Sequence, residues 1–327
     1  MTRTQVVDRL LGVLNGVVGD HLARTGNGLA IPMQIIRGGS PLPLELLQLE
    51  AIVPAPTSRV VVLVHGLTDT EACWDMPGGE SYGSFLARDL GYTPFTLRYN
   101  TGRHISENGE ALDSLLEQLV AAYPAPLDEL TLLGHSMGGL VLRSATHAAS
   151  VRGGSRWLPL ARRAIYLGSP HLGAPLERAG NALAWALRKV PDPVSVLLGD
   201  LVNLRSSGVK DLRYGYLRQE DWEGADPDAL LTNGRHPVPL LPHMRHHLVA
   251  GTLSDDPRMQ LLFGDALVPV PSATGRARTA DRCQPLPQEH VRVMPGMGHL
   301  RLTRDLEVYA QIRAWCEREA GWNGGGG

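Results

Sequence analysis

The sequence L-T-L-L-G-H-S-M-G-G-L at residues 130–140 decides the fold that we predict. An apolar run reaches Gly134, Ser136 follows, and Gly138 lies where a helix is expected to begin. This is the G-x-S-x-G pattern in a strand, turn and helix setting, where a sharp turn holds a serine in a cramped backbone conformation. Small residues two positions before and after Ser136 avoid the clashes that larger side chains would make.

The pattern by itself is weak evidence, because the chain contains 37 glycines. At that composition G-x-S-x-G arises by chance in about one of five such sequences. The interpretation therefore depends on the elements and partner residues that the rest of the chain supplies.

Length and composition favour one large α/β domain with an insertion. The chain has 327 residues, 43% of them hydrophobic, and a formal net charge of -2. A nearly neutral chain has no general attraction to nucleic acid or to an anionic membrane, so we expect a small-molecule substrate. No apolar run reaches the ~18 residues of a transmembrane helix, although peripheral contact with a membrane stays open.

The cysteines Cys73, Cys283 and Cys316 are widely spaced and form neither a disulfide framework nor a metal motif. Asp8 and Arg9 interrupt the apolar positions near the N-terminus, so no signal peptide is expected. These features predict a cytoplasmic protein. We expect no cofactor, and the oligomeric state stays open.

Residues 4–23 have the apolar spacing of an amphipathic helix. Gly12, Gly16 and Gly19 weaken this helix by about 1 kcal/mol each relative to alanine, so it needs a surface to lie on. Docking on its own domain is favoured over contact with a membrane or a second subunit.

The remaining apolar periodicity predicts strands that alternate with helices, which indicates an α/β fold with a mostly parallel, doubly wound sheet. Strands are expected at 29–36, 44–52, 59–64, 93–99, around 130–135, and at 163–167, 247–252 and 290–294, and helices at 81–90, 105–123 and 302–316.

The alternation breaks between Leu176 and Pro242, where a mainly helical insertion is expected. We therefore divide the chain into four parts. They are an N-terminal helix with short strands (residues 1–55), an α/β core (56–175 and 243–320), a cap or lid (176–242) and a flexible tail (321–327).

An activated serine needs a base, and the base needs an acid that orients it. His299 in P-G-M-G-H-L follows the last predicted strand, where a base is expected when the order is serine, acid, histidine. His290 is a poor rival because it begins that strand, at the opposite end of the sheet.

Asp265 in F-G-D-A-L is the predicted acid, because it lies between the last two strands. Asp255 and Asp256 lie nearer to the end of the preceding strand and are the runners-up, whereas Asp281 lies in an arginine-rich loop. The alternative for each is a solvated carboxylate in a turn.

An oxyanion formed by attack on a carbonyl needs preorganised donors, each worth about 3 kcal/mol of barrier. The N–H of Met137, directly after Ser136, is one predicted donor. The N–H of Leu67, in the loop after strand 59–64, is the second, and His65 in that loop is interpreted as structural.

Other polar clusters do not predict a site. The histidines at 236, 243, 246 and 247 lack the spacing of a metal site, and two neighbours in a strand point to opposite faces, so no metal is assigned. The arginines at 276, 278 and 282 are interpreted as a solvated loop.

The motifs V-H-G-L, G-H-S-M-G-G, G-S-P-H-L-G-A-P, G-D-A-L-V-P-V-P-S-A and G-M-G-H-L together resemble the α/β-hydrolase superfamily, specifically its bacterial lipase and esterase branch. The resemblance spans about residues 60–316. It implies that Ser136 is the nucleophile, Asp265 the acid and His299 the base, that Leu67 and Met137 form the oxyanion hole, and that residues 176–242 form a cap.

The expected function is hydrolysis of a carboxylic ester. Apolar residues in the insertion, such as Trp185 and Leu187, favour a small-molecule acyl ester or lipid-like substrate, and the length of the acyl chain stays open. A thioesterase or an acyltransferase would use the same acyl-serine chemistry. From a different class, a non-catalytic homologue that binds a ligand stays open as an alternative.

Overall fold

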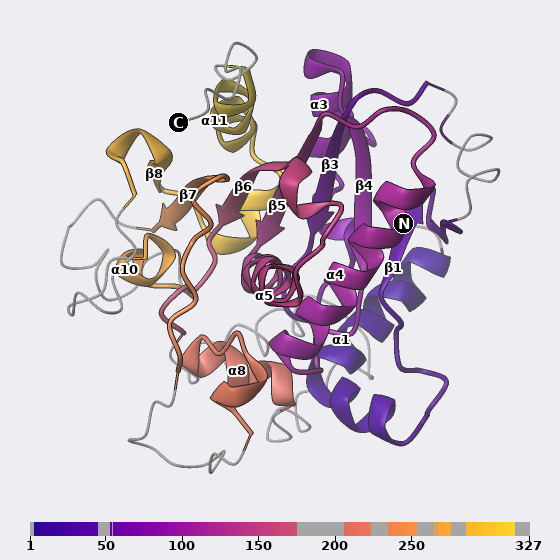
Figure 1. Cartoon of the computed structure of the whole chain (residues 1–327). Coiled ribbons are helices and arrows are strands. Elements are labelled where there is room, and N and C mark those ends of the chain that lie inside the picture. The colour runs from indigo at the N-terminus through magenta and orange to yellow at the C-terminus, as the bar shows by residue number, and fades with distance from the viewer. Residues whose placement is uncertain are drawn as a thin grey trace.

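The computed structural model describes most of the chain, namely residues 3–44, 53, 55–174, 206–223, 235–253, 265, 267–275 and 286–317. Within these residues, an eight-stranded sheet has the order β2-β1-β4-β3-β5-β6-β7-β8 (Figure 1). The strands are β1 (Gln34–Arg37), β2 (Ser40–Pro41), β3 (Arg59–Val64), β4 (Thr93–Arg98), β5 (Glu129–His135), β6 (Ala161–Leu167), β7 (Arg245–Thr252) and β8 (Val291–Pro295).

The strands from β3 to β8 pair in parallel, whereas β1 pairs antiparallel with both β2 and β4. This arrangement confirms the predicted mostly parallel sheet. The α-helices are α1 (Arg3–Arg24), α3 (Tyr82–Leu90), α4 (Ile105–Ala122), α5 (Met137–Arg152), α8 (Ser207–Tyr214), α10 (Val270–Ala273) and α11 (Leu306–Glu317). Short 3-10 helices are η1 (Glu71–Trp74), η2 (Leu158–Leu160), η4 (Gln219–Asp221), η5 (Gln288–His290) and η6 (His299–Thr303).

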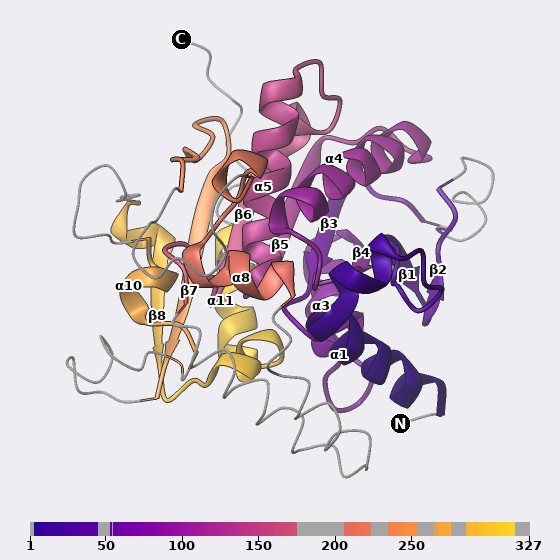
Figure 2. The same ribbon diagram turned by 90° about the horizontal axis from the view of Figure 1, so that it is seen from below.

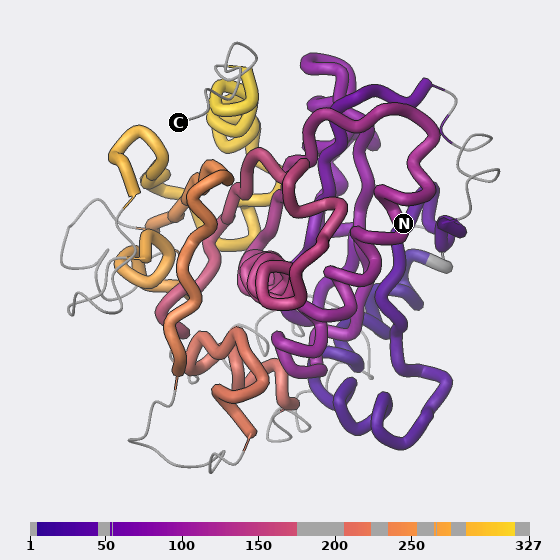
Figure 3. The backbone as a smooth tube through the Cα atoms, in the orientation of Figure 1, coloured from indigo at the N-terminus to yellow at the C-terminus, as the bar shows by residue number. Residues whose placement is uncertain are grey.

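Helices cover both faces of the sheet, and β3 shows why. Side chains alternate between the faces of a strand, so Val60, Val62 and Val64 join the apolar core under α4 and α5. Val61 and Leu63 join the second core, under α3 and α11. The backbone trace shows α4 and α5 next to each other beside the strands (Figure 3). A β-branched run buried on both faces is therefore the physical basis of the three-layer fold.

The helix α1 lies beside α8, with which it makes direct contacts (Figure 2). The Oγ of Ser206 donates a hydrogen bond to the carbonyl of Gly16 at 2.7 Å, and Asn15 Nδ2 donates to the carbonyl of Leu29 at 2.9 Å. The N-terminal helix is therefore packed on its own chain, as expected. In the part of the chain that the structure describes, no helix has the length and apolar character needed to cross a bilayer.

Three sequence-based boundaries need correction or comment. Residue 44 is not in a strand, and residues 45–52 of the strand expected at 44–52 lie outside the described residues. A strand that was not expected, β2 at Ser40–Pro41, pairs with β1 across a turn at Gly38 and Gly39. The closing helix begins at Leu306 and not at 302, because η6 ends where Arg304 leaves the helical region, at φ -147°. The helices expected within 176–204 also lie outside the described residues.

Leu132 in β5 provides a test of this core. It is completely buried, whereas Leu306 is 63% exposed at the start of α11. Leu132→Ala should lower the free energy of unfolding by about 2–5 kcal/mol, because a cavity adds to the lost burial. Leu306→Ala should change it by less than about 0.5 kcal/mol. Urea denaturation measures both, and equal effects would contradict the placement of β5 at the centre of the core.

Candidate active site

Ser136 lies in a strained turn between β5 and α5, with φ 53° and ψ -123°. A Cβ on Gly138 would lie 2.3 Å from the carbonyl oxygen of Val64, and one on Gly134 would lie 2.7 Å from the Cα of Gly139. The two small residues that the pattern requires are therefore needed for close backbone approach. The N–H of Ser136 donates to the carbonyl of Leu167 at 2.8 Å, which ties the turn to the end of β6.

Asp265 and His299 form a hydrogen-bonded pair, with 2.7 Å between Asp265 Oδ2 and His299 Nδ1. The other carboxylate oxygen accepts hydrogen bonds from the N–H groups of Leu267 and Val268, at 3.0 and 2.9 Å. The N–H of His299 also donates to the carbonyl of Asp265 at 3.1 Å. A neutral imidazole that donates from Nδ1 keeps its lone pair on Nε2, so the pair presents a basic nitrogen in a fixed orientation.

The pair lies beside the turn that carries Ser136. Gly168 directly follows Leu167, whose carbonyl accepts the hydrogen bond from the Ser136 N–H. A Cβ on Gly168 would lie 3.1 Å from both Asp265 Oδ2 and His299 Cε1. Ser136 is 8% exposed, and its side chain makes no capping hydrogen bond to α5. Contacts between a serine and its base are often long in the free protein and tighten when substrate binds.

The loop after β3 lies directly against Ser136, because a Cβ on Gly66 would be 3.0 Å from the Ser136 Cβ. This loop carries Leu67, and the other predicted donor, Met137, is the first residue of α5. Thr68 has φ 61°, and Thr68 and Ser136 are the only non-glycine residues with positive φ among those described. The N–H of Thr68 donates to Thr101 Oγ1 at 3.1 Å.

Two buried histidines support the site. His135 donates from Nε2 to the carbonyl of His299 at 3.1 Å, and the two rings lie 4.7 Å apart. His65 donates from Nδ1 to the carbonyl of Gly66 at 2.9 Å and stacks on Tyr99. Burial lowers the pKa of His135 far below its usual value and that of His65 to about 4. Both rings are therefore neutral at neutral pH and act as packing and hydrogen-bonding groups.

The rival residues lie elsewhere. His290 belongs to η5, immediately before β8, and its ring lies 4.5 Å from that of His247. The neighbouring His246 instead contacts Tyr166, so adjacent β7 histidines face opposite sides. Among the described residues, no group of histidine, cysteine and carboxylate side chains is arranged to hold a metal ion. The rival acids at 255, 256 and 281 and the arginines at 276, 278 and 282 lie outside the described residues.

Thr68, His135 and Gly168 are parts of the site that the sequence did not single out. Thr68 follows the predicted donor, yet a threonine gives no signal of a left-handed conformation. His135 is within the nucleophile motif, but its bond to His299 joins residues 164 apart in the chain. Gly168 offers a weak signal, because it directly follows β6 at the edge where ligands bind.

The comparison with protein families now complements this geometry. A family model described as "Alpha/beta hydrolase family" matches residues 61–312, which include the Ser136 turn, Asp265 and His299. The chain belongs to the alpha/beta hydrolase family. This confirms the resemblance to the α/β-hydrolase superfamily that the motifs indicated. A comparison of the sequence with curated proteins finds no match.

Solved structures similar to this alpha/beta hydrolase include bacterial lipases. The Bacillus licheniformis lipase BlEst2 in its propeptide form is 16% identical, with a TM-score of 0.51 over 84% of this chain and 54% of that one. Its mature form is 16% identical, with a TM-score of 0.49 over 80% and 93%. Lipase 1 from Pelosinus fermentans is 14% identical, with a TM-score of 0.48 over 81% and 99%. At such low identity the similarity shows the fold alone.

Buried histidines predict that this alpha/beta hydrolase loses stability in acid. His246 accepts a hydrogen bond from the Tyr166 hydroxyl, donates to the carbonyl of Leu241, and has its pKa lowered by burial from 6.5 to about 4. Between these values the unfolded chain binds more protons than the folded one, so the free energy of unfolding falls as pH decreases. The contribution of His246 is about 2 kcal/mol between pH 7.5 and pH 5.

Urea unfolding at the two pH values measures this effect. His246→Gln should lose less stability in acid than the wild type, by about 2 kcal/mol. His21→Gln is the matched control, because His21 is exposed on α1, and it should follow the wild type. An identical loss in all three proteins would contradict the role of His246.

Proposed function

We propose that the chain is a serine hydrolase of carboxylic esters, with Ser136 as nucleophile, His299 as base and Asp265 as the orienting acid. The observation that carries the proposal is the 2.7 Å hydrogen bond between Asp265 and His299, next to a serine held at φ 53°. Membership of the alpha/beta hydrolase family supports it.

In the proposed first step, Ser136 Oγ attacks the ester carbonyl while His299 Nε2 takes the hydroxyl proton. The carbonyl oxygen becomes an oxyanion, which the N–H groups of Leu67 and Met137 are proposed to stabilise. The tetrahedral intermediate collapses when the C–O bond to the alcohol breaks and His299 returns the proton to that alcohol. The product is an ester between the acyl group and Ser136.

In the second step, water attacks the acyl carbon and gives a proton to His299. The bond between the acyl carbon and Ser136 Oγ then breaks, and His299 returns the proton to the serine. Asp265 stays ionised throughout and stabilises the transient imidazolium. Its carboxylate is suited to this role because two backbone N–H groups also bind it.

The proposed substrate is a small-molecule acyl ester or a lipid-like ester, selected by a cap formed from residues 176–242. Of that segment, the structure describes residues 206–223 and 235–242. We also propose a cytoplasmic location, with which the free and buried thiols of Cys73 and Cys316 are compatible.

Replacement of Ser136 and His299 tests the assignment. Ser136→Ala and His299→Gln should each lower kcat for a p-nitrophenyl ester by at least ~10⁴-fold, because both act as one unit. His290→Gln is the matched control and should keep wild-type activity. Circular dichroism checks that all three variants are folded. Wild-type turnover by folded Ser136→Ala would eliminate the proposal.

Asp265→Asn tests the acid separately. The amide introduced at position 265 can hold the His299 ring but favours its wrong tautomer, so kcat should fall by about 10⁴-fold. Ser136 should still react with a fluorophosphonate, but more slowly than in the wild type. Asp305→Asn is the control carboxylate, in the segment between η6 and α11. If Asp265→Asn and Asp305→Asn had equal and nearly normal kcat values, Asp265 would not be the acid.

A series of p-nitrophenyl esters from acetyl to palmitoyl, with the matching thioesters, tests the substrate class. The proposal expects faster hydrolysis of oxygen esters than of thioesters. A preference for acetyl indicates an esterase and a preference for palmitoyl a lipase. A reversed order between the two ester types would replace the proposed substrate with a thioester.

A further inference from the structure

The N-terminal helix α1 touches the loop after β3 through its glycines. A Cβ on Gly16 would lie 2.4 Å from Thr68 Cγ2, 3.0 Å from Thr68 Cα and 3.1 Å from Thr68 N. A Cβ on Gly12 would lie 2.9 Å from the carbonyl oxygen of Asp69 and 2.8 Å from Thr70 Cγ2. The helix backbone and the loop backbone are therefore in contact, with no room for a side chain between them.

These contacts explain residues that are otherwise unfavourable in a helix. Glycine is a poor helix former because it loses more backbone freedom than alanine. Gly12 and Gly16 are four residues apart, so they lie on one face of α1, and that face meets the loop. The helix uses this face to approach the loop closely.

The position of α1 is fixed independently of the loop. Asn15 Nδ2 donates to the carbonyl of Leu29, and Asn15 Oδ1 accepts from the N–H of Ile31, both at 2.9 Å. Asn100 Nδ2 donates to the carbonyl of Gly19 at 2.8 Å. These bonds tie α1, which is kinked at Val18 (φ -133°, ψ 15°), to residues 29–31 and to Asn100 in the loop after β4.

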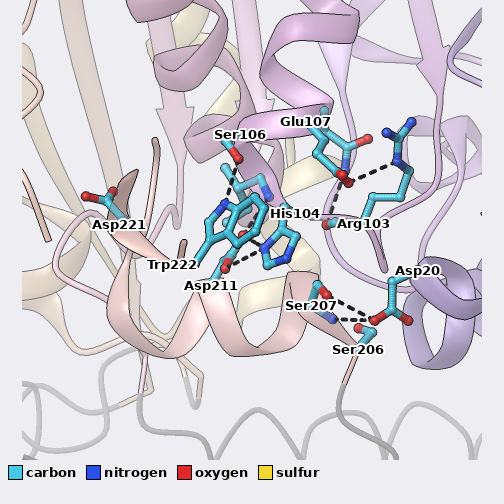
Figure 4. A network of polar contacts seen from close by, with 12 residues as sticks. Asp20, Arg103, His104, Ser106, Glu107, Ser206, Ser207, Asp211, Asp221 and Trp222 are labelled. Carbon is cyan, nitrogen blue, oxygen red and sulfur yellow. Dashed lines mark hydrogen bonds and ion pairs between the residues drawn. The ribbon is translucent and has the colours of Figure 1, made fainter. Parts of the chain in front are cut away.

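On its far side, α1 is bound to the segment that begins α8. Asp20 Oδ2 accepts from the N–H and the hydroxyl of Ser207, at 3.1 and 3.0 Å (Figure 4). The hydroxyl of Ser206 donates to the Gly16 carbonyl. The Gly16 peptide is thus held between Ser206 and Thr68.

Thr68 occupies a conformation that its surroundings must maintain. Its φ of 61° is costly for a β-branched residue. Gly16 contacts Thr68 on one side, and on another side the N–H of Thr68 donates a hydrogen bond to Thr101 Oγ1. The Thr68 hydroxyl donates to the carbonyl of Leu67 at 2.6 Å, which couples Thr68 to the residue before it.

We propose that α1 is a positioning element for the oxyanion hole, in which Gly16 fixes Thr68 and thereby aims the N–H of Leu67 at the developing oxyanion. This inference rests on the proposed function of Ser136 and Leu67. An oxyanion donor works only within hydrogen-bond distance of the oxygen, so a small displacement of this loop reduces kcat.

Gly16→Ala tests the inference, with Gly28→Ala as the matched control, because no atom lies within 4 Å of a Cβ placed on Gly28. Turnover of a p-nitrophenyl ester is divided by the number of active sites titrated with a fluorophosphonate. Gly16→Ala should lower kcat per titrated site by about 10-fold or more and change KM by less than about 2-fold. The midpoint of the pH profile should stay the same, because His299 and Asp265 are not moved.

Rescue provides a readout that a merely structural role would not give. Thr68→Ser removes the Cγ2 methyl that would clash with the methyl group added by Gly16→Ala, but it keeps the hydroxyl. The double variant Gly16→Ala with Thr68→Ser should therefore recover part of the lost kcat per site. If Gly16→Ala does not fold, Thr68→Gly is measured instead, because glycine accepts the positive φ but lacks both the methyl group that packs against Gly16 and the hydroxyl that donates to the carbonyl of Leu67.

The outcomes separate this inference from the proposed function. A wild-type protein that neither turns over esters nor reacts with the fluorophosphonate would overturn the proposed function. If the wild type is active, equal per-site kcat values for Gly16→Ala and Gly28→Ala overturn the role of α1 alone. Where Thr68→Gly is the variant measured, a wild-type per-site kcat overturns that role too.

Discussion

The structure depends on one constrained residue, the serine at the end of the central strand. Ser136 stays at φ 53° because the ends of the neighbouring strands hold the turn on both sides. On the β3 side, Gly138 of α5 lies close to the carbonyl of Val64. On the β6 side, the carbonyl of Leu167 accepts a hydrogen bond from the N–H of Ser136. Regular parallel strands supply fixed carbonyl groups at their ends, and such rigid surroundings can maintain a costly backbone conformation. The apolar core therefore sets the geometry of the candidate site.

Burial also sets the chemical character of the histidines around this residue. His65 and His135 are enclosed by aromatic and main-chain groups and stay neutral, which leaves them as hydrogen-bonding supports. His299 differs because its Nδ1 faces the carboxylate of Asp265. Residues of the same type thus have different roles, and the difference comes from the partner of each ring nitrogen.

The sequence predicted those features that local patterns encode. Strong periodic or steric signals mark the β-branched run of β3, the glycines around Ser136 and the apolar spacing of α4. Because the loops that follow parallel strands meet at one edge of the sheet, Asp265 and His299 could also be placed near each other. The start of α11 and the conformation of Thr68 could not be predicted. They depend on long-range contacts, such as that between Gly16 and Thr68, which no local pattern reports.

The contacts of α1 have a consequence for the order of folding. The glycines of this 22-residue helix make it a weak helix in isolation. Its partners are the loops near Thr68 and Asn100 and the Ser206 hydroxyl, which lies 190 residues from Gly16 in the chain. The packing of α1 is therefore complete only when the segment around Ser206 is folded, so we expect α1 to be among the late-folding parts of the molecule.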